Sequence, residues 1–316
     1  METSLAVFFA ILPIFLIIGF GFLAPQFGWL NADSELSLMK LVINLLYPAL
    51  IFNFILGNNI LRQPGNLLLP PLLGFVMVVV GFSLSMIVAH KFKIGDPQEC
   101  NTFAFITGIQ NSVYFPLPII ALLFERQTIG VLMVFNLGVE IALWLFGVGF
   151  ILSPRNPISI LKRIFSVPVV AIVIALLVNY HGYDRNVPEF AFEAFRLLGQ
   201  CTIPLALLLI GATFADFKTS AKLFVGLKVP FLASVVRLVV MPVLVLLVAF
   251  FLPISTELKR VVVVQAAMPC AVFPILLARH FDGSPVIAFK AVFSTTLLSL
   301  LTIPLWIRAG IRLLNL

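Results

Sequence analysis

The sequence has very few charged side chains. Only 10% of its 316 residues are Asp, Glu, Lys or Arg, whereas 61% are hydrophobic. A soluble domain carries about 25% charged residues, because its surface must face water. The shortage excludes a soluble protein and indicates an α-helical protein that crosses a membrane several times. The apolar runs are about 20 residues long and do not alternate with polar residues, so they are not typical of a β-barrel.

Cysteine and histidine are also scarce. The three cysteines, Cys100, Cys201 and Cys270, are far apart and lie in or beside apolar segments. They form neither a metal-ligand pattern nor a disulfide framework. The sequence lacks the P-loop, the HExxH motif and the nucleophile elbow of soluble enzymes. It therefore predicts a protein that is not an enzyme and that uses no cofactor or metal.

Basic residues are in excess but scattered. The net charge is +7, and most Lys and Arg residues lie in short loops, with no basic run that contains interleaved aromatics. This distribution suits the surface of a lipid bilayer and not a nucleic acid. Slightly more basic residues fall on the side away from both termini. The count favours a protein of the plasma (inner) membrane with both termini outside.

Ten apolar segments follow one another along the chain, and we expect each to be a transmembrane span. They lie at roughly 5–24, 36–56, 67–90, 102–124, 128–151, 165–180, 195–214, 225–252, 259–279 and 286–307. Residues 1–152 hold the first five, a short loop follows at 153–164, and residues 165–316 hold the other five.

Proline positions relate the two sets of five. Three matches occur in the same order: Pro48 with Pro204, Pro70 with Pro230, and Pro116 with Pro274. An odd number of segments in each set reverses the direction of the second set relative to the first. The predicted fold is therefore all-α, with two inverted repeats of five helices.

The fourth segment, FAFITGIQNSVYFPLPIIALLF, should be a broken helix. It contains Gln110 and Asn111, followed by Pro116 and Pro118. Proline removes a backbone donor, and freed carbonyl groups at membrane depth require protein or a watery cavity to satisfy them. The ninth segment is broken in the same way by Pro269 and Pro274. We expect the two segments to cross, with Asn111 opposite Pro269.

A crossing of broken helices predicts a binding site. Half-helix N-termini carry partial positive charge and unpaired N–H groups, which attract anions. The residues at the predicted crossing are Gln110, Asn111, Ser112 and Tyr114 from the fourth segment, with Gln265, Met268, Pro269 and Cys270 from the ninth. Amides and hydroxyls of this kind can hold a carboxylate. The alternative is that these polar groups only hold helices together.

Two ionisable residues lie inside predicted spans. Glu140 is in the middle of the fifth segment, with Asn136 one turn earlier, and Arg237 is midway along the eighth. An ionisable side chain in a membrane has an unfavourable transfer free energy, so we expect one found there to have a function. Glu140 could carry a proton, bind a cation such as Na⁺, or pair with Arg237, which could instead balance an anionic substrate. A charge pair that merely fixes two helices is the alternative.

The second segment contributes a further candidate. Asn53, like Asn44, flanks Pro48. These amides could line the wall of a substrate cavity, or bond to the backbone that Pro48 frees.

Taken together, these residues resemble the auxin efflux carrier family. The ten-segment pattern, YPALIF in the second segment, the spacing from Asn111 to Pro118, and a proline-broken ninth segment followed by ARHFDGSP carry the resemblance over essentially the whole chain. The family includes the plant PIN auxin carriers and bacterial transporters of dicarboxylates such as malate or malonate.

The resemblance implies a fold similar to that of the bile-acid sodium symporters and of NhaA. Spans one, two, six and seven would form a scaffold domain, and spans three to five and eight to ten a transport domain. Spans four and nine would cross at their prolines, and the scaffold would form a homodimer. Asn111 matches the asparagine that binds the substrate carboxylate in PIN carriers, and Pro269 matches the ninth-span crossover proline. Glu140 lies four residues before Trp144, where PIN carriers have Gln, so it should line the same pocket.

Two departures from PIN carriers bear on mechanism. Gln110 stands where they have proline, and Glu140 in place of Gln favours linkage to a proton or cation. The sequence thus predicts a secondary transporter of small organic anions, mono- or dicarboxylates, that works by an elevator or rocking motion. The alternatives are a sodium-coupled symporter of bile-acid type and a membrane sensor that binds ligand without flux.

Overall fold

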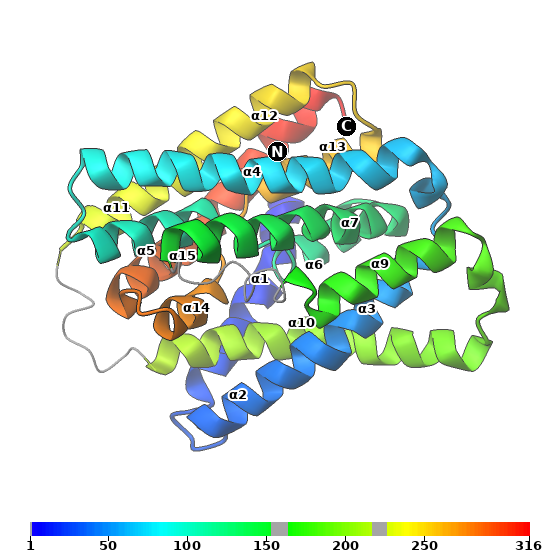
Figure 1. The fold of residues 1–316 in the computed structure, drawn as a ribbon, viewed down its shortest axis with the longest axis horizontal. Coiled ribbons are helices and arrows are strands. Elements are labelled where there is room, and N and C mark those ends of the chain that lie inside the picture. The colour runs from blue at the N-terminus through cyan, green and yellow to red at the C-terminus, as the bar shows by residue number, and fades with distance from the viewer. Residues whose placement is uncertain (1, 153–163, 217–225) are drawn as a thin grey trace.

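The protein is a bundle of long, tilted helices (Figure 1). The computed structural model describes residues 2–152, 164–216 and 226–316, so most of the predicted loop at 153–164 lies outside the described residues. The helices are α1 Glu2–Leu23, α2 Ala32–Leu41, α3 Tyr47–Ile55, α4 Pro64–Lys91, α5 Pro97–Gly108, α6 Pro116–Leu123, α7 Arg126–Ala142, α9 Val167–Tyr180, α10 Glu189–Asp216, α11 Lys228–Val235, α12 Met241–Phe251, α13 Thr256–Ala266, α14 Pro274–His280 and α15 Pro285–Leu314.

Short helical turns of other types complete the bundle. The π-helical turn η1 (Val42–Leu46) joins α2 to α3, η6 (Val236–Val240) joins α11 to α12, and η3 (Leu143–Leu152) extends α7. The 3₁₀ turns η2 (Asn59–Arg62) and η4 (Tyr183–Asn186) lie in the connections after α3 and α9. Each π turn joins or extends helices along one continuous path, so that α2 with α3, and α11 with α12, each form one long helical unit.

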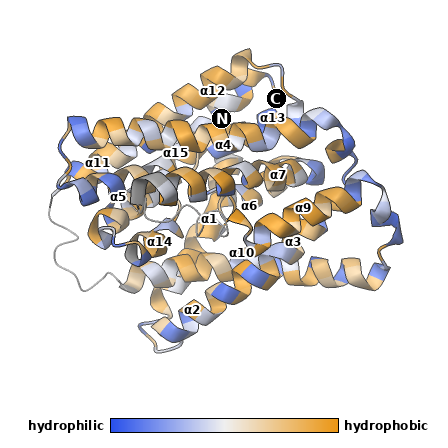
Figure 2. Ribbon diagram, in the orientation of Figure 1, coloured by the Kyte–Doolittle hydropathy of each residue, from blue (hydrophilic) through white to orange (hydrophobic). Residues whose placement is uncertain are grey.

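Within the described part, six helical units are long and apolar enough to cross a membrane. They are Ala32–Ile55, Pro64–Lys91, Arg126–Gly149, Glu189–Ala215, Lys228–Phe251 and Pro285–Leu314. Hydrophobic residues occupy most of the length of these helices, and polar residues gather at their ends (Figure 2). The protein is therefore all-helical with several membrane-spanning helices. The expected segments 102–124 and 259–279 are each divided into two shorter helices.

One group of helices is built around α10, which packs against α1 and α3, while α3 also packs against α9. Glycine permits the close approach of α1 and α10. A side chain at Gly21 would collide with the backbone of Leu208, and one at Gly211 would collide with the backbone of Ile18. Small residues at such contacts are typical of helix packing in membranes, where van der Waals contact replaces the hydrophobic effect.

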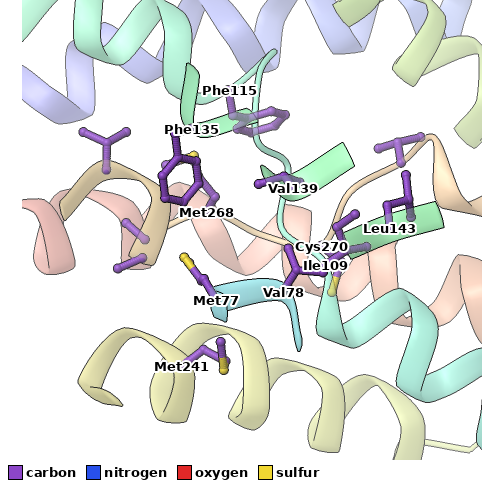
Figure 3. Close-up of a cluster of buried hydrophobic side chains, with 14 of the residues drawn as sticks. Met77, Val78, Ile109, Phe115, Phe135, Val139, Leu143, Met241, Met268 and Cys270 are labelled. Atoms are coloured by element: carbon purple, nitrogen blue, oxygen red, sulfur yellow. The ribbon is translucent and has the colours of Figure 1, made fainter. Parts of the chain in front are cut away.

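The other group contains α4, α5, α7 and the helices from α11 to α15. Within it, α4 packs against α5 and α7, α7 packs against α13, and α11 packs against α15. Its centre is a cluster of buried apolar side chains (Figure 3). Met77 from α4, Phe135 from α7 and Met241 from α12 meet there, beside Met268 and Cys270. This cluster surrounds the point at which two helices are interrupted.

The two interruptions are residues 109–115, between α5 and α6, and residues 267–273, between α13 and α14. They pair with each other through one isolated antiparallel bridge, between Gln110 and Cys270. The N–H group of Asn111 donates to the carbonyl of Pro269 over 2.8 Å, and that of Ala271 donates to the carbonyl of Ile109 over 3.1 Å. Pro116 and Pro274 then open the following helices, at a position where the missing N–H group is not needed. The pairing satisfies part of the backbone that the interruptions free.

Candidate substrate-binding cavity

A cavity lies between the two groups of helices. Its empty volume is about 1100 Å³, part of it continuous with the exterior. One wall comes from α2, η1, α9 and α10, and the other from the first interruption, the α7–η3 junction and residues 271–274. The lining is mostly apolar, which is usual for a small-molecule site. Its polar side chains and aromatic donors are Tyr47, Gln110, Asn111, Ser112, Tyr114, Glu140, Trp144, Ser166 and Thr213.

Among these residues, Asn111 has a side chain held in place by hydrogen bonds to the backbone. Its side-chain Oδ1 accepts from the N–H groups of Tyr114 over 3.2 Å and Phe115 over 3.4 Å, so it caps the start of α6. Its Nδ2 group donates to none of the described residues, although the side chain lines the cavity. The cap thus fixes the amide in one orientation and leaves two N–H donors for a ligand.

Glu140 lies in the cavity wall near the C-terminal end of α7 and is half-buried. It forms no ion pair with any described residue. The hydroxyl groups of Tyr47 and Tyr114 are close enough to interact with its charge, and the indole of Trp144 lies beside it. Among the described residues of the wall there is no Lys, Arg or His. Glu140 is therefore the dominant charge of the cavity whenever it is ionised.

The helix N-termini contribute less than the sequence suggests. At α6 the N–H groups of Tyr114 and Phe115 are already taken by Asn111, and Pro116 has none. At α14 the N–H groups of Val272 and Phe273, both in the cavity wall, donate to no acceptor within the described ranges. These two groups are therefore available to an anion.

Two glutamines brace the first interruption. The side chain of Gln265, on α13, donates from Nε2 to the carbonyl of Ser112 over 2.8 Å. That of Gln110 reaches the Met77 sulfur at 3.8 Å. Gln110 lines the cavity but is fully buried, and Gln265 lies behind the wall. Gln265 therefore positions the segment and does not face a ligand.

Arg237 is not in the cavity, and it does not pair with Glu140. It is fully buried on η6, and its Nε donates to the carbonyl of Met268 over 3.0 Å. Its Nη1 and Nη2 groups have no partner among the described residues. The helical unit Lys228–Phe251 thus brings it to the second interruption, two residues past the end of α13. Its positive charge there faces the negative end of that helix dipole.

Other sequence candidates also lie away from the cavity wall. Pro269 and Cys270 face the pairing between the interruptions, and the Cys270 N–H donates to Thr295 Oγ1 over 3.3 Å. Asn136 is buried one turn behind Glu140 on α7. Asn53 bonds to Arg126 near the far end of the helix, because its side chain lies nearly two turns past Tyr47. The predicted site residues that line the cavity are Gln110, Asn111, Ser112, Tyr114, Glu140 and Pro274.

Sequence reasoning did not select Tyr47 as a site residue. It lies in the YPALIF stretch, at the point where η1 passes into α3, and its ring faces the cavity. The sequence feature that could have identified Tyr47 is a hydroxyl group next to a proline inside an apolar span. Trp144 carried a similar signal, because an indole four residues after Glu140 shares its helix face.

Comparison with known proteins agrees with the transmembrane architecture. A family model described as "Membrane transport protein" matches residues 6–160 and 155–307. An uncharacterized transporter of Methanocaldococcus jannaschii is 24% identical over 301 residues, which cover 94% of this chain and 96% of the relative. An uncharacterized transporter of Methanothermobacter thermautotrophicus is 22% identical over 300 residues, with the same coverage.

Proposed function

Since the chain belongs to the membrane transport protein family, identified from its sequence as the auxin efflux carrier family, we propose that it is a secondary transporter of small organic anions. It is a transporter and not an enzyme. Its substrates are mono- or dicarboxylates, held in the cavity between the two groups of helices. The observation that carries this proposal is the Asn111 side-chain amide, which is fixed by its cap and whose Nδ2 group has no acceptor among the described residues.

The proposed arrangement in the membrane extends the helices described above to ten spans in two inverted repeats. Residues 1–152 and 165–316 are the repeats, and the fourth and ninth spans cross at the paired interruptions. The group of α1, α2, α3, α9 and α10 is the scaffold, and the remaining helices are the transport domain, which moves against the scaffold in an elevator motion. The protein resides in the plasma membrane with both termini outside, as a homodimer through the scaffold. The contacts within each group support this division.

Coupling follows from the charge of the cavity. A carboxylate substrate would enter a site whose described wall carries one acidic side chain, Glu140, and no basic one. Two like charges about 6 Å apart repel by about 3 kcal/mol at an effective dielectric constant of about 20. Substrate binding is therefore favoured when Glu140 has taken up a proton. A bound cation such as Na⁺ beside Glu140 would have the same effect, which is the bile-acid-type alternative.

The test is uptake by proteoliposomes over a range of pH. The wild-type protein should bind a carboxylate more tightly as the pH falls, because protonation of Glu140 removes the repulsion. The variant Glu140→Gln should bind at every pH as the protonated protein does, about 100-fold tighter than wild type at high pH. Its uptake should no longer be driven by a proton gradient. A Glu140→Gln variant with the pH profile of the wild type would sink the coupling proposal, and ligand binding without uptake in the wild type would favour a sensor.

A second candidate is a transporter of organic cations. The observation that favours it is the same wall, in which Glu140 forms no ion pair with a described residue and the aromatic rings of Tyr47, Tyr114 and Trp144 lie near it. Such rings attract cations. A thermal-shift screen with matched carboxylates and amines separates the two candidates, because Glu140→Gln should abolish stabilisation by an amine and retain stabilisation by a carboxylate.

A further inference from the structure

The cavity is lined by residues from one end of the helices around it, and the opposite end is joined by polar contacts. In the unit Ala32–Ile55, the wall residues lie between Met39 and Tyr47, whereas Asn53 is in the last turn. On α7, Glu140 is in the wall and Arg126 is the first residue. At a rise of about 1.5 Å per residue, Arg126 is about 20 Å from Glu140 along the helix.

At that far end, α3 and α7 are held together through Arg126. Its Nη2 donates to the Asn53 carbonyl over 2.7 Å and to Asn53 Oδ1 over 2.8 Å. The guanidinium lies 5.1 Å from the centre of the Phe54 ring. The carbonyl belongs to the last turn of α3, where the helix dipole favours a positive charge. Charge-assisted contacts of this kind are stronger than neutral ones.

A second contact reinforces the first. The side chain of Asn58 donates from Nδ2 to the carbonyl of Gln127 over 3.0 Å. Gly130, one turn later on α7, lies so close to Asn58 and to the carbonyl of Phe54 that no side chain would fit. The two helices are thus in direct backbone contact at this end.

Asn58 itself is held from the scaffold side. Asn179, near the end of α9, donates from Nδ2 to the Asn58 carbonyl over 2.9 Å. Arg62 donates to the carbonyl of Asn179 over 3.2 Å and forms an ion pair with Asp184 at 2.9 Å. Asn53 and Asn58 therefore belong to the scaffold side of this contact. Their partners on the other group of helices are Arg126 and Gln127.

We propose that Arg126, with Asn53 and Asn58, forms a latch that closes the protein at the end of the helices opposite the cavity lining and must open during transport. The inference rests on the proposed alternating-access function. It assigns Asn53 to the gate and not to the substrate. The latch is suited to release, because Arg126 is exposed and water can replace its hydrogen bonds.

The experiment measures access to the cavity and needs no substrate. Ala271 lines the cavity, and Cys201 is the exposed one of the three cysteines. Ala271→Cys in a Cys201→Ser background then reports labelling by a membrane-impermeant maleimide added on the Arg126 side. In that background, Arg126→Gln should increase the labelling rate about 10-fold, the shift expected when a charge-assisted hydrogen bond is lost. Asn53→Ala should give a smaller increase, because the backbone carbonyl of Asn53 remains.

The matched control is Arg196→Gln. Arg196 is an exposed arginine on α10 that pairs with Glu193, on its own helix. Equal labelling in Arg126→Gln and its parent, or an equal increase in the control, overturns the latch. Failure of both Arg126→Gln and Asn53→Ala to fold also overturns it, because a contact that opens in every cycle cannot be required for folding. Increased labelling without uptake of any carboxylate would count against the proposed function and leave the latch in place.

Discussion

The two interrupted segments are alike in sequence but differ in what they contact. Residues 109–115 place Gln110, Asn111, Ser112 and Tyr114 in the cavity wall. In residues 267–273, the middle residues 268–270 do not line the cavity, and side chains on the other side of the segment bind them. Arg237 donates to the carbonyl of Met268, and Thr295 accepts from the N–H group of Cys270. The first segment carries the polar side chains available to a ligand, whereas the second contributes only backbone at its end, at Val272 and Phe273, and otherwise supports the first.

The difference explains why Asn111 and Pro269 are not equivalent, although they are paired. Asn111 uses its backbone N–H to bond Pro269, its Oδ1 to cap α6, and has Nδ2 left for a ligand. Pro269 offers only a carbonyl, which Asn111 already occupies. A proline at this position also cannot donate elsewhere, so it ends α13 without competing for acceptors. Each of the following substitutions tests one side of this division.

The largest effect should come from the first segment. Asn111→Asp keeps the capping oxygen and removes the Nδ2 donor while adding a negative charge. It should fold with near wild-type stability and lose carboxylate affinity at least about 100-fold, since a charged hydrogen bond is lost and a like charge is gained. Isothermal titration and thermal unfolding measure the two effects separately.

Asn111→Ala is the companion variant for that experiment. It removes the cap as well as the donor, and should also lose about 1 kcal/mol of stability. If Asn111→Asp binds carboxylates as well as the wild type does, then Asn111 acts only as a helix cap and the contrast between the segments fails.

A smaller effect, of a different kind, is expected behind the second segment. Thr295→Val keeps the shape of the side chain and leaves the buried N–H group of Cys270 without an acceptor, which costs about 1–3 kcal/mol. The unfolding temperature should fall by several degrees, and carboxylate affinity should remain within about threefold of the wild type. A large loss of affinity with unchanged stability would place the second segment in the binding site and reverse our assignment.

The smallest effect should come from Pro269→Ala. The carbonyl that accepts from Asn111 is retained, so the pairing of the two segments should persist. The expected loss is within about 1 kcal/mol, from the greater freedom of the unfolded chain. Thermal unfolding in the presence and absence of a carboxylate would check it. A Pro269→Ala variant as impaired as Asn111→Ala would show that the proline itself holds the site.

The sequence was informative wherever a residue was costly in a membrane. The shortage of charge gave the membrane class, and the prolines with Gln110 and Asn111 marked the broken fourth segment, because such residues have no reason to lie in lipid. Glu140 was marked for the same reason, and the structure places it in the cavity wall. Composition and local chemistry alone therefore located the middle of the candidate site.

Only the tertiary structure decided which polar groups face the cavity and which hold helices together. Asn53 and Arg237 are at least as costly in a membrane as Asn111, yet one meets Arg126 and the other meets the Met268 carbonyl. The sequence shows that a buried polar group needs a partner, but the partner lies in another segment, more than 30 residues away in both cases. Its identity depends on the rotation and depth at which the helices pack, and these are set by close contacts such as those of Gly21, Gly130 and Gly211.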